Sequence, residues 1–149
     1  MTRYKRSLLI QSAVILLATV AAVVGLMHLK DYVNRSEAMR AMTQLGGRIL
    51  DYRSIHGSLP PQSFIDDVKD QVDGAVRIGN VRYRALWIGL GAPDETILAY
   101  SEKRHSSSFL DDGFVVLRLN GTVEWLPSAQ FRALLATQRA DSEGPLDKP

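Results

Sequence analysis

One histidine and two aspartates are the side chains whose types and spacing could do chemistry. His105 stands six and seven residues before Asp111 and Asp112. An imidazole can carry a proton or bind a metal, and carboxylates are competent ligands and proton carriers. The segment that joins them, SSSFLDDG, also fits a plain solvated turn, which we favour. A hydrolase or a metal-binding protein working through these three residues is therefore our least favoured hypothesis.

The densest acidic cluster comprises Asp66, Asp67, Asp70 and Asp73, before Gly74. An EF-hand loop places its ligands at every second position before the glycine, and this spacing differs. We interpret the cluster as the solvated face of a helix. The chain has no cysteine, so thiolate and disulfide chemistry are unavailable. We expect no enzymatic activity, no catalytic residue and no bound cofactor.

The elements that position these residues begin with an apolar run. Leu8 to Leu29 carry no formal charge and are enough to cross roughly 30 Å of hydrocarbon at 1.5 Å per residue. The run predicts a single-pass transmembrane helix with membrane lipid around it. A cleaved signal peptide is the alternative, because residues 20–22 are small and follow a basic and then an apolar stretch. The run continues past that point, which favours a retained anchor.

The charge distribution predicts the topology. Arg3, Lys5 and Arg6 precede the apolar run, and 15 of the 18 basic residues follow it against 16 acidic ones. The positive-inside rule places such an N-terminus in the cytoplasm. We therefore expect the chain in the inner (cytoplasmic) membrane, with the rest of it on the outer side. The outer part is near neutral, which removes the usual electrostatic argument for nucleic-acid binding, so we expect no nucleic-acid partner. We therefore predict a cytoplasmic tail at 1–7, a transmembrane helix at 8–29, an extracytoplasmic domain at 30–138 with the helix continuing over 30–56, and a disordered tail at 139–149.

The helix continuation is amphipathic. Its apolar residues step by four, three, four and three, which places them on one narrow face at about 100° per residue. We call this face the helix seam and expect it to pack on a folded domain. It comprises Ala38, Met42, Leu45, Ile49 and Tyr52.

Strand-like segments follow. We predict strands in AVRI (75–78), VRYRALWIGL (81–90) and TILAYSE (96–102), which are rich in β-branched and aromatic residues. Residues 114–119 and 122–126 flank Asn120-Gly121, a dipeptide typical of a type I′ hairpin with a two-residue loop. That loop pairs Leu119 with Thr122. We therefore expect one face of the hairpin to cover the helix seam, with side chains from Phe114, Val116, Val123 and Trp125.

Two short helices complete the pattern. One is predicted over 63–72 with Ser63 as its N-cap, and the other begins at Ser128 as N-cap and places Phe131, Leu134 and Leu135 on one face. The predicted fold class is α+β, in which a long N-terminal helix packs on a small antiparallel β-sheet beside a short C-terminal helix.

Several of these segments resemble a known family. A basic tail, an apolar helix that becomes amphipathic, the exit segment YRSIHGSLP (52–60) and the distal sequence FVVLRLNGTVEWL (114–126) are similar to type IV pilins and to the pseudopilins of type II secretion. The resemblance covers about residues 36–135. It implies a structural subunit of a secretion or pilus-type assembly in the bacterial envelope, with other pilin-like subunits or secretion components as partners.

The resemblance also defines two open questions. The prepilin-peptidase site of those families, a glycine before phenylalanine and a glutamate five residues after the cut, has no counterpart between Lys5 and Ser12. We therefore expect no cleavage by that peptidase, and a stand-alone anchored binding or accessory domain stays the alternative function. Pseudopilins can hold calcium in a loop of the sheet, which by analogy makes Asp111 and Asp112 weak calcium candidates.

Overall fold

The computed structural model describes residues 3–89, 91–105 and 110–144, and its first element confirms the long helix. α1 is a single α-helix of 54 residues, Arg3–His56. It ends where Gly57 adopts a left-handed conformation, with φ at +71°, and its amide donates to the Arg53 carbonyl oxygen at 2.8 Å. Glycine suits this cap because it has no Cβ to clash.

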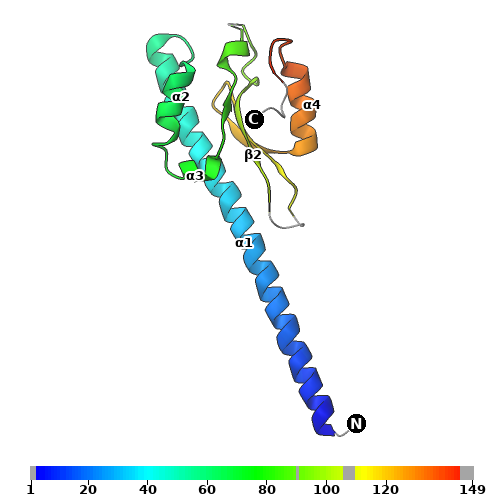
Figure 1. Cartoon of the computed structure of the whole chain (residues 1–149). Coiled ribbons are helices and arrows are strands. Elements are labelled where there is room, and N and C mark those ends of the chain that lie inside the picture. The colour runs from blue at the N-terminus through cyan, green and yellow to red at the C-terminus, as the bar shows by residue number, and fades with distance from the viewer. Residues whose placement is uncertain (1–2, 90, 106–109, 145–149) are drawn as a thin grey trace.

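The outer half of α1 lies on a four-stranded antiparallel sheet, as Figure 1 shows. The strands follow chain order, β1 Arg82–Tyr83, β2 Ile97–Lys103, β3 Gly113–Arg118 and β4 Val123–Pro127. α4, Ser128–Gln138, covers the opposite face of the sheet. The predicted α+β fold class, with its long helix, small sheet and short C-terminal helix, is confirmed.

The segment between α1 and the sheet differs from prediction. α2, Gln62–Lys69, is the expected short helix, but Pro61 rather than Ser63 is its N-cap. The residues AVRI form a helical turn, α3 Ala75–Ile78, instead of a strand. Most of the next predicted strand is also absent, because β1 holds two residues and a 3₁₀ turn, η1, follows at Ala85–Trp87. Short apolar runs fit helix and strand alike, and here packing against α1 decided for helix.

The hairpin register is one residue away from the predicted one. Leu117 pairs with Val123 and Val115 pairs with Trp125, whereas a two-residue loop would have paired Val116 with Trp125. Gly121 has φ at +86°, while Asn120 does not adopt positive φ as a type I′ turn requires. The Asn120 side chain instead accepts from the Thr122 amide at 2.9 Å. The turn therefore has three residues and ends on a left-handed glycine.

This one-residue shift decides which side chains meet α1, because neighbouring strand residues point to opposite faces. Val115, Leu117 and Leu119 lie in the larger core with the helix seam. The residues of the smaller core, between the sheet and α4, are Ile97, Tyr100, Phe114, Val116, Phe131 and Leu135.

Candidate functional site

The helix seam is buried as the spacing predicts. Ala38, Met42, Leu45 and Ile49 have no exposed surface. Tyr52 at its outer end is half-buried, and its ring stacks on His56 at a centroid distance of 4.0 Å. The seam allows a close approach at Gly46, where an added Cβ would lie 2.7 Å from Leu117 Cδ1.

The sheet residues predicted to meet the seam divide between the two faces. Val123 and Trp125 pack against the seam's core as expected. The prediction for Phe114 and Val116 was wrong, because both point toward α4. The register shift is the physical reason, and it brings Val115 and Leu117 to α1 in their place.

The His105 and Asp112 pair forms a turn contact. The Asp112 carboxylate accepts from the His105 backbone amide at 2.7 Å. The Nδ1 atom of the His105 ring lies 2.9 Å from the Asp111 backbone carbonyl oxygen. The same ring stands 5.3 Å from the Trp125 ring. In these contacts the Asp112 carboxylate meets the His105 backbone and the imidazole meets the Asp111 backbone. They therefore do not bring the imidazole and the two carboxylates together as one site. Among the described residues, no group of three or more histidine, aspartate or glutamate side chains could hold a metal ion.

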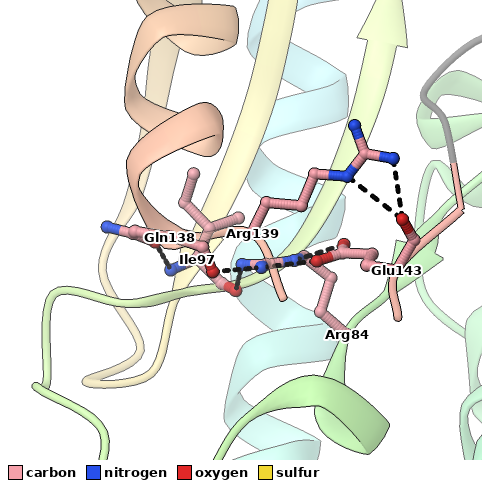
Figure 2. Close-up of polar contacts among 5 residues, drawn as sticks. All are labelled: Arg84, Ile97, Gln138, Arg139 and Glu143. Atoms are coloured by element: carbon pink, nitrogen blue, oxygen red, sulfur yellow. Dashed lines mark hydrogen bonds and ion pairs between the residues drawn. The ribbon is translucent and has the colours of Figure 1, made fainter. Parts of the chain in front are cut away.

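A buried ion pair ties the end of the chain to the sheet. Figure 2 shows Arg84, 1% exposed, donating to both carboxylate oxygens of Glu143 at 2.7 and 2.8 Å. The same guanidinium donates to the carbonyl oxygens of Ile97 and Gln138 at 2.7 and 2.9 Å. Arg139 donates to the Glu143 carbonyl oxygen. We call Arg84, Gln138, Arg139 and Glu143 the C-terminal latch.

The C-terminal latch corrects the prediction of a disordered tail from residue 139. Glu143, at 8% exposure, is held by Arg84 and Arg139, while Asp141, Ser142 and Gly144 are exposed, and 145–149 lie outside the described residues. Sequence reasoning missed this site because Arg84 and Glu143 are 59 residues apart and neither belongs to a motif. A bidentate arginine–carboxylate pair is among the strongest side-chain contacts, so the tail as far as Glu143 is part of the fold.

A cleft of about 520 Å³ lies at the outer end of α1. Tyr52 and Arg53, near the end of α1, line one side of the cleft. Ala85 and Leu86, in the segment after β1, line the other side. Leu86 is 86% exposed beside it. Small-molecule sites usually have volumes of about 300–1,000 Å³, so the cleft is large enough for one.

The inner half of α1 is bare. Its most apolar window has a mean hydropathy of 2.4 and none of it is buried, so the helix is long and apolar enough to cross a membrane. Small and branched side chains form a shallow apolar hollow on one of its faces, lined by Ile10, Ala13, Val14, Leu17, Ala18 and Ala21.

Burial shifts the titration of one tyrosine near the cleft. Tyr83 donates from its hydroxyl to the Pro60 carbonyl oxygen at 2.9 Å. Burial first, and the nearby Tyr52 second, raise the pKa of the Tyr83 phenol well above its ordinary value. The phenol is therefore neutral at physiological pH and fixes the helix exit to β1 through a hydrogen bond.

Comparison with known proteins identifies no relative, since no family model, curated protein or solved structure matches this chain.

Proposed function

We propose that this protein is a membrane-anchored, pilin-like structural subunit of an envelope assembly, with its N-terminus in the cytoplasm and its sheet domain outside. The observation that carries the proposal is the continuity of α1. One helix joins the bare apolar half to the half that forms the domain's core. The domain is thereby held at a fixed height and orientation, as lateral packing of many copies requires.

Two further features support a structural role. The sheet has a cover on each face, α1 on one and α4 on the other, so its own cores are complete. The inner half of α1 offers a long, continuous apolar surface, with Leu16 68% and Leu17 74% exposed. Helices in a membrane associate through close packing at small residues, and Ala13, Ala18 and Ala21 lie in the hollow on one face.

Cysteine cross-linking in the native membrane tests this proposal. Because the chain has no cysteine, single cysteines can be placed in turn over residues 13–25 of the full chain. We expect disulfide-linked dimers with a yield that repeats every 3.6 residues and peaks at Ala13, Leu17 and Ala21. Thr19 points away from the hollow and is the matched control. Uniformly absent dimers, or yields without a helical period, would contradict the proposal.

The outer cleft favours a second candidate, an anchored binding or accessory domain. Its volume and its apolar lining around Leu86, with Arg53 at one side, fit a small ligand or a peptide end. Under this function Leu86→Asp would abolish ligand capture while leaving cross-linking along α1 unchanged. Under the structural function the same substitution would leave assembly intact, because the cleft lies at the opposite end of the helix.

A further inference from the structure

Two adjacent glycines in the outer half of α1 have different surroundings. Glycine is, after proline, the least favourable residue inside a helix, so each of them weakens α1. Gly46 is required by packing, because an added Cβ would lie 2.7 Å from Leu117 Cδ1. At Gly47 an added Cβ would meet no neighbouring atom within 4 Å. Packing among the described residues therefore does not require Gly47, and the space beside it is open.

That space is a pocket of about 240 Å³ between α1 and the segment that begins with α2, which Figure 1 shows beside the outer half of α1. At about 30 Å³ for each water, it holds about eight waters or one small molecule. Its lining comes from one face of α1, from α2 and from the turn after α2, and comprises Gln44, Gly47, Arg48, Asp51, Val68, Gln71 and Val72.

The pocket carries one charge of each sign. Arg48 and Asp51 both line it from α1. Within the described part of the chain, neither side chain forms an ion pair or a hydrogen bond. The two are not paired with each other either, although helix positions three residues apart are neighbours. Both charges are therefore available to a ligand.

Uncharged groups complete the lining. The Gln44 side-chain oxygen accepts from the Asp73 backbone amide at 3.1 Å, which fixes the side chain and leaves its NH₂ group to donate. Gln71 adds a second amide from the opposite side. Val72 is buried and Val68 is half-buried, so the pocket also has an apolar wall.

This lining has the chemistry that recognises a zwitterion. Asp51 would repel a simple anion that Arg48 attracts, and Arg48 would repel a simple cation that Asp51 attracts. A molecule that carries both a carboxylate and an ammonium group satisfies both side chains. The planar guanidinium suits a carboxylate, and a carboxylate accepts well from an ammonium group.

We propose that the pocket between α1 and α2 binds an α-amino acid with a short apolar side chain. Arg48 binds its carboxylate, Asp51 binds its ammonium group, and Val68 and Val72 contact its side chain. The inference goes beyond the proposed structural function and does not depend on it, because the pocket lies in the outer domain. The pocket also shares no lining residue with the outer cleft.

Backbone amide shifts in NMR spectra of the full chain in lipid nanodiscs test the ligand class. The probe is L-valine, and its matched analogues are isobutylamine, which lacks the carboxylate, and 3-methylbutanoate, which lacks the ammonium group. We expect saturable shifts at Gly47 and Gln71 with L-valine. Either analogue should bind at least ten-fold more weakly, because it loses a charged hydrogen-bond partner.

Three results of this titration would overturn the inference. They are the absence of saturable shifts with millimolar L-valine, equal binding of all three probes, and shifts at Leu86 in the outer cleft in place of those at Gly47.

Substitutions of the two charged residues test the named contacts. Arg48→Gln and Asp51→Asn should each weaken L-valine binding at least ten-fold, because each removes one charged partner. Arg40→Gln changes an exposed arginine of α1 that does not line the pocket, so this matched control should bind as the parent does. Unchanged affinity in both pocket variants would overturn the assigned contacts.

Gly47→Leu separates a blocked pocket from a loss of folding. The leucine side chain would occupy the pocket while favouring the helix. We therefore expect L-valine binding to be abolished in a chain that unfolds at the same or a higher temperature than the parent. Binding retained in this variant, or lost in Leu86→Asp at the outer cleft, would overturn the location. Cross-linking along α1 tests copy association independently of these results.

Discussion

The two faces of the sheet are covered by different means. On one face, α1 packs aliphatic side chains from its seam against β3, with Gly46 directly against Leu117. On the other, α4 packs an aromatic group in which the Phe114 and Phe131 rings stack at 3.9 Å. The first contact joins residues about 70 positions apart, whereas α4 directly follows the hairpin that it covers.

The two helices therefore have different roles in the fold: α1 supports the whole domain, and α4 covers one face locally. α1 has two partners, the sheet at its outer half and the proposed membrane at its inner half, so its outer contact must hold the domain at a fixed height. α4 closes a core built from the adjacent hairpin, and the C-terminal latch fastens its end. We therefore expect damage to the α4 face to unfold locally and damage to the α1 face to unfold the whole domain.

Truncation of one aromatic side chain gives the largest expected effect. Phe131→Ala removes a fully buried ring that stacks on Phe114 and lies 4.8 Å from Tyr100. Such a truncation costs about 3–5 kcal/mol in free energy of unfolding. Hydrogen exchange should accelerate in α4 while amides of the α1 seam stay protected. Leu45→Ala should cost about 2–5 kcal/mol in free energy of unfolding. It should accelerate hydrogen exchange on both faces of the sheet together. Identical exchange patterns would remove the distinction.

Breaking the C-terminal latch should have the next largest effect. Arg84→Met leaves the Glu143 carboxylate buried without its partner, which costs about 3–5 kcal/mol when the charge stays buried. Residues 139–144 can swing into water, so we expect the lower end of this range, measured by urea unfolding. The double variant Arg84→Met with Glu143→Leu should recover most of the loss, because an apolar pair replaces the ion pair. No recovery would indicate that Arg84 acts mainly through the Ile97 and Gln138 carbonyl oxygens.

A pair of adjacent glycines tests the close approach on the α1 face. Gly46→Leu would force its side chain against Leu117, and overpacking of this kind costs about 1–3 kcal/mol. Gly47→Leu meets no atom within 4 Å and should stabilise the helix by about 0.5–1 kcal/mol. Thermal unfolding of the two variants should therefore shift in opposite directions. A shift in the same direction would show that α1 is not closely packed at Gly46.

The comparison also explains what could be predicted from sequence. The seam of α1 follows from helical spacing, and α4 follows from Phe131, Leu134 and Leu135, because each pattern is local. Strand pairing depends on the turn, and Asn120 without positive φ shifted the hairpin by one residue. Because of that single change, Val115 and Leu117 face α1 where Phe114 and Val116 were predicted.

The long-range ion pair between Arg84 and Glu143 could not be predicted from the sequence. Arg84 lies in a run of apolar and basic residues that was predicted as a strand, and Glu143 lies in a polar tail. Their pairing arises from the return of the chain after α4, which brings residue 143 beside β1. α3 was misassigned for a related reason, since packing on α1 fixed the conformation of its four residues.

Two buried tyrosines, one on each face, give the smallest and most selective prediction. Burial raises the pKa of both Tyr83, in the α1 core, and Tyr100, in the α4 core. At Tyr100 the nearby charge of Arg82 lowers the pKa and offsets part of that rise, so Tyr83 has the larger shift.

A raised folded-state pKa leaves stability unchanged below the unfolded pKa of about 10, and stability falls above it because only the unfolded phenol ionises. Tyr83→Phe loses the hydrogen bond to Pro60 and should cost about 1 kcal/mol at neutral pH. It also removes this alkaline loss, so the free energies of unfolding of variant and parent should converge above about pH 10. Tyr100→Phe should show weaker convergence. A difference between Tyr83→Phe and parent that stays constant with pH would mean that the Tyr83 phenol is hydrated, and that the α1 face is open where β1 meets the helix exit.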